Sequence, residues 1–232
     1  MQTKAILILT LLVTSFMSGF AAAPLVYEGE QGLGKGKHLV FIASDHEYRS
    51  EETLPALARI LAKHHGFKCS VVFGVNAKGE IQPGANNVPG IEELANADLM
   101  VVFTRFQNWP EDQMKHFVDY MKRGGPVLGL RTSTHAFNYT RNKQSPYARF
   151  TFRNNEWKGG WGRQVLGETW INHHGHHGRE STRGITEEAN KAHPILNGVD
   201  DIWGPTDVYG VRNTLEDATI LVRGAVLAGM KP

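Results

Sequence analysis

The sequence predicts an α/β fold: a doubly wound, mainly parallel sheet of the flavodoxin type. Short apolar runs alternate with helical patterns, and glycine, proline or asparagine separates one element from the next. Such alternation is typical of a parallel sheet with helices on both faces. The expected strands are the four apolar runs at residues 38–43, 68–73, 99–103 and 126–130. Their nearly continuous apolar character indicates strands that are buried on both faces.

Two longer helices are expected between these strands. The first takes Ser50 as its N-cap, carries leucine and isoleucine at core spacing, and ends at Gly66. The second has Pro110 at its first position and acidic residues in its first turn, and it ends near Gly124. A shorter helix is expected at residues 91–96. Helices that join consecutive parallel strands give the right-handed crossovers of a doubly wound sheet.

The pattern loosens after residue 139. Residues 141–163 show no helical period, and residues 165–171 are expected to form a strand. The segment at residues 172–178 reads Asn-His-His-Gly-His-His-Gly, and the last apolar run covers residues 219–222. The second half of the chain therefore offers fewer local signals than the first.

Composition and charge exclude several classes of protein. The chain has 232 residues, of which 41% are hydrophobic, and a formal net charge of +2. These values indicate one globular domain without a surface for nucleic acid. Cys69, the single cysteine, excludes an intrachain disulfide and a multi-cysteine zinc site. No Walker motif is present, and the glycines at residues 32–36 precede a strand instead of following it, so no nucleotide cofactor is expected.

The N-terminus is typical of a secretory signal peptide. Lys4 precedes an apolar run at residues 5–20, and three alanines follow at residues 21–23. We therefore expect residues 1–23 to be a signal peptide, residues 24–36 a lead-in segment, and the mature protein to be secreted or periplasmic. The alternative is a retained anchor, for which the apolar run is short against the ~20 residues that span a bilayer. No second run of this kind follows, so no membrane span is expected after cleavage.

Polar side chains are concentrated in the loops that follow three of the expected strands, at residues 44–50, 104–109 and 131–135. Because ligands bind at the carboxyl ends of parallel strands, we expect these loops to share one hollow. The candidate catalytic residues are His46 and His135, which would move protons, and Asp45 and Glu47, which would set their protonation state. The candidate substrate-binding residues are Arg105, Arg131, Thr132 and Thr134. Two alternatives remain: the carboxylates cap the helix after them, or they pair with the arginines in a purely structural network.

The histidine-rich segment is a candidate metal site. Imidazoles three or four residues apart can share one ion, and zinc accepts such ligands together with a carboxylate and a water. We assign His174 and His177 as the candidate ligands of a divalent metal such as zinc. The alternative is a flexible, hydrated loop, because two glycines give the segment little support.

Several motifs together resemble the ThuA-like, trehalose-utilisation family. They are Ser-Asp-His-Glu-Tyr-Arg at residues 44–49, Gly-Leu-Arg-Thr-Ser-Thr-His at residues 129–135, His-Pro-Ile at residues 193–195, Gly198, and Thr-Asp-Val-Tyr at residues 206–209. That family belongs to the class I glutamine amidotransferase-like superfamily, which has a flavodoxin-like fold. The resemblance implies a ThuA-like domain at residues 37–232 and places Asp207 and Tyr209 in the same substrate site.

Two departures from that pattern matter. The amidotransferases carry a nucleophilic cysteine after the fourth strand, where this chain has Arg131, so the resemblance implies that the chain is not a glutamine amidotransferase. Relatives also continue into a further strand and helix, so a C-terminally truncated domain is expected. The resulting hypothesis is an exported protein of carbohydrate metabolism, an enzyme that acts on a sugar or keto-glycoside by acid/base chemistry, with or without a metal. Hydrolase, isomerase and lyase chemistry all stay open, as does the oligomeric state. The alternative is a non-catalytic carbohydrate-binding module.

Overall fold

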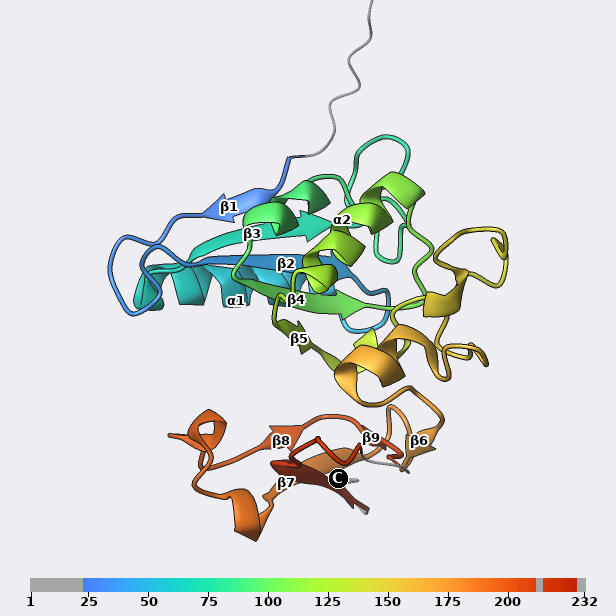
Figure 1. Cartoon of the computed structure of the whole chain (residues 1–232). Helices are drawn as coiled ribbons and strands as arrows, with labels where there is room; N and C mark the ends of the chain where they lie inside the picture. The colour runs from blue at the N-terminus through green and yellow to red at the C-terminus, as the bar shows by residue number, and fades with distance from the viewer. Residues whose placement is uncertain (1–22, 212–214, 229–232) are drawn as a thin grey trace, which may run out of the picture.

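A computed structural model describes residues 23–211 and 215–228, so residues 1–22 of the expected signal peptide lie outside the described residues (Figure 1). The central sheet has five strands in the order β1-β3-β2-β4-β5. Strands β2, β3, β4 and β5 are parallel, and β1 pairs with β3 in the antiparallel direction. The strands are β1 (Leu25–Tyr27), β2 (His38–Ser44), β3 (Lys68–Phe73), β4 (Leu99–Thr104) and β5 (Val127–Gly129).

The four expected strands are thus confirmed within one residue at each end, and the central sheet is mostly parallel. Every residue of β2 is buried, as its apolar run indicates. Successive residues of β2 face opposite layers: Phe41 belongs to the core under α1 (Ser50–His65), and Val40 and Ile42 belong to the core under α2 (Glu111–Lys122). Helices therefore cover both faces of the sheet, with η1 (Ile91–Asn96) beside α2 (Figure 1).

The helix ends show two small differences from the sequence expectations. Arg49, with φ of 54°, occupies the N-cap position of α1, and Ser50 is the first helical residue. The Ser50 hydroxyl instead accepts a hydrogen bond from the Asp45 amide at 3.0 Å, which ties the helix start to the preceding loop. Pro110 is the N-cap of α2 and not its first residue. Gly66 ends α1 in the left-handed conformation, as expected.

The expected strand at residues 165–171 is wrong. Residues Gly162–Leu166 form a π-helical turn, η4, and Gly167, with φ of 90°, ends it. Leu166 packs directly over Gly129 of β5, where an added Cβ would lie 2.5 Å from its Cδ1 atom. Tertiary packing against a glycine thus overrides the local strand propensity of this apolar run.

Small antiparallel sheets follow. Strand β6 (His173–His174) pairs with β9 (Val208–Tyr209), and β7 (Ser181–Thr186) lies between β10 (Val222–Leu227) and β8 (Trp203–Gly204). Figure 1 shows these strands gathered beyond β5, next to the central sheet. The remaining short helices are η2 (Arg131–His135), η3 (Ala148–Phe150), η5 (Glu188–Asn190) and η6 (Pro194–Leu196). Within the described part of the chain, we find no helix with the length and apolar character needed to cross a membrane.

Candidate functional site

The three polar loops meet at the carboxyl ends of the parallel strands. The Gln107 side chain donates a hydrogen bond to the carbonyl oxygen of Ser44 at 2.9 Å. The Thr132 hydroxyl donates to Oδ1 of Asp45 at 2.8 Å, and the Phe106 amide donates to the carbonyl of His135 at 3.0 Å. Residues 44–50, 104–109 and 131–135 therefore form one connected edge of the sheet.

Each of these loops contains one strained residue. Among the described residues, the non-glycine residues with positive φ are Arg49 at 54°, Phe106 at 53° and Arg131 at 34°. A non-glycine residue held in such a conformation costs about 1–3 kcal/mol, and strain of this kind is concentrated at functional sites. The backbone thus marks the same edge as the side-chain chemistry does.

The two carboxylates of the first loop, Asp45 and Glu47, differ in their exposure to solvent. Asp45 is completely buried and accepts hydrogen bonds from the Glu47 and Tyr48 amides and from Thr132. These contacts shape the loop and involve both carboxylate oxygens of Asp45. Glu47 is partly exposed, and its Oε2 atom lies 2.9 Å from Nε of Arg105. Glu47 is therefore the carboxylate that faces the site.

Glu47 lies in the middle of a chain of charged and titratable groups. Its other oxygen, Oε1, is 3.2 Å from Nε2 of His177, which comes from the histidine-rich segment. On the other side, the Arg105 guanidinium lies 2.7 Å from Nε2 of His46 and over the ring of Phe106. Three consecutive contacts therefore link four side chains from distant parts of the protein, in the order His46, Arg105, Glu47 and His177.

His135 lies in an aromatic enclosure instead of on the surface. Its ring is 2% exposed and is surrounded by the rings of Phe106, Phe152, Trp170 and Tyr209, at centroid distances of 4.9, 6.0, 5.4 and 5.7 Å. Burial, reinforced by the positive charges of Arg105 and Arg131, lowers the pKa of His135 to about 3. This imidazole is neutral near pH 7. So weak a base favours a hydrogen-bonding role for His135 over proton transfer.

Arg131 links the third loop to the C-terminal half. Its guanidinium donates to the carbonyl oxygen of Asp207 at 2.6 Å, to Oδ1 of Asp207 at 3.0 Å and to the Tyr48 hydroxyl at 2.9 Å. It also lies over the Tyr209 ring, 4.1 Å from the centroid. Its Nε atom is buried and has no hydrogen-bond partner among the described residues. Asp207 and Tyr209 therefore lie at this edge, where the family resemblance placed them.

The hydroxyl groups of the third loop, residues 131–135, already form hydrogen bonds within the protein. Thr132 and Ser133 are completely buried, and Ser133 donates to the carbonyl of Val102 at 2.7 Å. The Thr134 hydroxyl lies 3.2 Å from Nδ1 of His135. Thr132 supports Asp45, and Thr134 orients His135, so neither hydroxyl needs a ligand to satisfy it.

The Asp207 carboxylate contacts three side chains of the site. Its carboxylate is fully buried and contacts Arg131, His173 at 2.8 Å and His177 at 3.2 Å. Burial alone would raise its pKa, but the hydrogen bonds from His177 and Arg131 outweigh burial and hold the pKa of Asp207 below its ordinary value. The group is therefore a buried, ionised carboxylate.

The metal-capable cluster differs from the expected pair His174 and His177. Ligand atoms of His173, His177 and Asp207 lie within 4.8 Å of one another. His174 is exposed, because β6 directs successive side chains to opposite faces and His173 takes the inner one. The cluster takes two of its members from the histidine-rich segment, and a two-residue strand is too short to be recognised in the sequence. Trp170, one of the five tryptophans of the chain, lies beside both His135 and His173.

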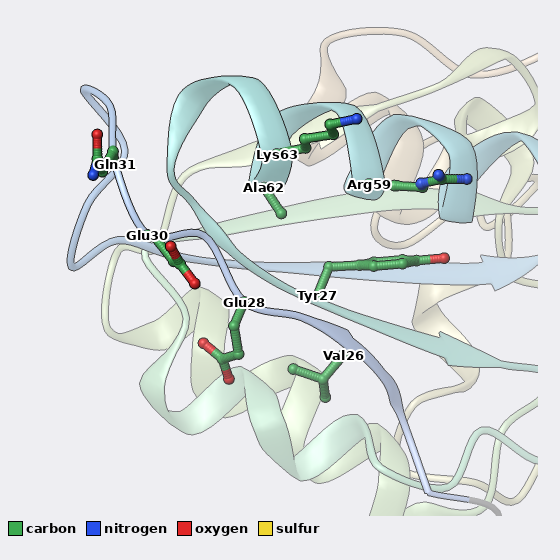
Figure 2. Close-up of a pocket in the computed structure, with 8 residues that line it drawn as sticks. All are labelled: Val26, Tyr27, Glu28, Glu30, Gln31, Arg59, Ala62 and Lys63. Carbon is green, nitrogen blue, oxygen red and sulfur yellow. The ribbon is translucent and has the colours of Figure 1, made fainter.

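A cavity of about 580 Å³ lies away from this edge, between β1 and α1. Figure 2 shows Arg59 and Lys63 of α1 on one side and Glu28 and Glu30, from the segment after β1, on the other. None of the three polar loops contributes to its lining.

Comparison with known proteins supports the fold. No family model and no curated protein matches the chain. A solved ThuA-like protein from Bacteroides uniformis is similar, with a TM-score of 0.52, 12% identity, and coverage of 84% of this chain and 71% of that chain. Another, from Parabacteroides merdae, has a TM-score of 0.44, 14% identity, and coverage of 75% of this chain and 64% of its own. The chain therefore has a ThuA-like fold.

Proposed function

We propose that this protein is a carbohydrate-active enzyme that binds a sugar or keto-glycoside at the carboxyl edge of its central sheet. One observation supports the proposal above all: four side chains contact one another in the order His46, Arg105, Glu47 and His177. Imidazole and carboxylate groups, the usual carriers of protons in catalysis, are thus held together by the Arg105 guanidinium. Likeness to ThuA-like proteins adds the context of trehalose utilisation. The order β3-β2-β4-β5, with helices on both faces, supports a flavodoxin-like, doubly wound arrangement, whose ligands bind at this edge.

Two unsatisfied donors and several aromatic rings favour a sugar as the ligand. The Nε atom of Arg131 and the indole nitrogen of Trp170 are both buried without a hydrogen-bond partner among the described residues. Buried donors are nearly always satisfied, so each of these would take an acceptor oxygen from beyond the described residues, and a bound sugar offers such oxygens. The rings of Trp170 and Tyr209 flank His135 and offer the apolar faces on which sugar rings stack. A polyhydroxylated ring supplies both kinds of contact.

Glu47 and His46 are the groups that we assign to proton transfer. Glu47 would accept a proton from substrate carbon or water, and His46 would return one to the leaving oxygen. Arg105 lies between them, where it orients both groups and stabilises negative charge on a substrate oxygen. Isomerisation, elimination and hydrolysis all use such a pair. His135 and Arg131 would orient the substrate, and export, indicated by residues 1–23, would place the activity outside the cytoplasm.

A carbohydrate-binding module is the second candidate. Ser133, the serine of the third loop, is fully buried and hydrogen bonded to the backbone, so it is not placed to act as a nucleophile. Binding without turnover would follow from the same aromatic and arginine contacts.

Turnover of a panel of glycosides and their keto derivatives tests the proposal. We expect Glu47→Gln to lower kcat by about 100-fold, the lower end of the range for general acid/base groups, and to leave KM within a small factor. Glu92→Gln, an exposed residue at the start of η1, is the matched control and should leave kcat unchanged. Binding of the same glycosides without turnover by the unmodified protein would favour the binding module. Equal kcat for Glu47→Gln and the unmodified protein would remove Glu47 from the reaction.

A further inference from the structure

We infer that His173, His177 and Asp207 form a binding site for one divalent metal ion, with zinc as the best match, and that a sugar oxygen completes its coordination. Only the identity of that last ligand rests on the proposed function. Two imidazoles and one carboxylate are ligands that zinc prefers, and three protein ligands leave a position open, as in catalytic zinc sites. The ion would polarise the sugar oxygen beside Glu47.

The three side chains converge from different parts of the chain. Nδ1 of His173 lies 2.8 Å from Oδ2 of Asp207, and Nδ1 of His177 lies 3.2 Å from Oδ1 of the same carboxylate. The two imidazole centroids are 4.6 Å apart. Tetrahedral zinc with bonds of about 2.0–2.1 Å requires its ligand atoms to be about 3.4 Å apart, and the separations of 2.8 and 3.2 Å lie close to this spacing.

The backbone supports this arrangement despite the glycines in the segment. β6 pairs with β9: His173 is opposite Tyr209, and His174 is opposite Val208, the residue that follows Asp207. The turn after β6 is closed by a hydrogen bond from the His176 amide to Oε2 of Glu180 at 2.7 Å. Gly175, with φ of 105°, passes so close to Asp207 that an added Cβ would lie 3.1 Å from the Asp207 Cβ. The glycine here allows close approach of the ligands.

Outer contacts orient two of the ligands. Nε2 of His177 faces Oε1 of Glu47 at 3.2 Å, which leaves Nδ1 for the ion. A carboxylate behind the second nitrogen is the usual partner of a metal-bound histidine, because it fixes the tautomer and increases ligand basicity. Arg131 contacts Oδ1 of Asp207, so Oδ2 remains for the ion. The positive charge of Arg131 weakens cation binding, and we therefore expect lower affinity than in a structural zinc site.

Metal titration of the full chain, stripped with chelator and dialysed, tests the site. Calorimetry with Zn²⁺ and visible absorption with Co²⁺ should both show one equivalent bound, with an intense tetrahedral Co²⁺ band. His173→Ala and His177→Ala should each lower affinity by at least about 100-fold, and Glu47→Gln by about 10-fold. His174→Ala is the matched control, since it removes the adjacent but outward-facing imidazole, and it should leave affinity unchanged. Equal unfolding midpoints of the metal-free variants would show that folding is intact.

The results separate the metal site from the proposed function. Absence of stoichiometric binding, or equal weakening by His174→Ala, would overturn the site and leave His177 as a hydrogen-bonding link between Glu47 and Asp207. Stoichiometric binding that depends on His173 and His177, with no turnover of any glycoside, would uphold the site and reject the enzymatic role. Should an alanine variant fail to fold, the Glu47→Gln affinity decides, because that residue contacts a ligand and not the ion.

Discussion

Stability at acidic pH should depend on His135 more than on any other single imidazole. The pKa of this residue is lowered from 6.5 to about 3 in the folded protein by burial, and by Arg105 and Arg131. Between these two values the unfolded chain binds a proton that the folded chain does not, so the free energy of unfolding falls as pH falls. The stability is complete above about pH 6.5 and declines toward pH 3. For one histidine the loss between pH 7 and pH 5 is about 2 kcal/mol, with a limiting slope of about 1.4 kcal/mol per pH unit.

Urea denaturation at pH 7, 6 and 5, with chelator present, measures this loss. The variant His135→Gln keeps a polar side chain next to Thr134 but has no proton to gain. We expect it to be less stable at pH 7 and to lose about 2 kcal/mol less than the unmodified protein between pH 7 and pH 5. All other titrating groups, including His38, whose pKa is also lowered by burial, are common to both proteins and cancel in the difference. Parallel stability curves for the two proteins would refute the neutral, enclosed state of His135.

Other predictions concern the ion pair of Asp207 with Arg131, the thiol of Cys69, and Gly175 in the turn after β6. Asp207→Asn removes the partner of Arg131 and should cost about 3 kcal/mol of unfolding free energy in urea, and a loss below about 1 kcal/mol would show that the pair is effectively solvated. Burial raises the pKa of Cys69 to about 11, so a disulfide reagent at pH 8 should label it only after denaturation; rapid labelling of the folded protein would contradict its burial. Gly175→Ala should lower stability by about 1–2 kcal/mol and weaken Zn²⁺ binding, because its φ is 105° and an added Cβ would lie 2.8 Å from Val226. Unchanged Zn²⁺ affinity in that variant would argue against close approach at the turn.

The first half of the fold could be predicted because its signals are local. Strands such as β2 and β4 are continuous apolar runs, and Gly66 and Pro110 mark helix ends by their own backbone preferences. The turn at Leu166 was not predictable in this way, because the contact with Gly129 that stabilises it joins distant parts of the chain.

The candidate site was predictable as a location and less so as a set of roles. The rule that ligands bind at the carboxyl ends of parallel strands selects three loops that meet at one edge of the sheet. It does not decide between Asp45 and Glu47, since that choice depends on which carboxylate the loop amides bind. Nor does it decide between His173 and His174, which differ only in the face that β6 gives them. The low pKa of His135 depends on its burial by aromatic rings, and one of these, Tyr209, is distant from it in the sequence.

The position of a bound sugar tests the central claim most directly. A crystal structure with a slowly turned-over glycoside should show the sugar at the carboxyl edge, against Trp170 and Tyr209, with an oxygen accepting from Nε of Arg131. The cavity between β1 and α1 serves as the internal comparison (Figure 2). A sugar bound there, with the carboxyl edge occupied only by water, would contradict the assignment of this edge as the carbohydrate site.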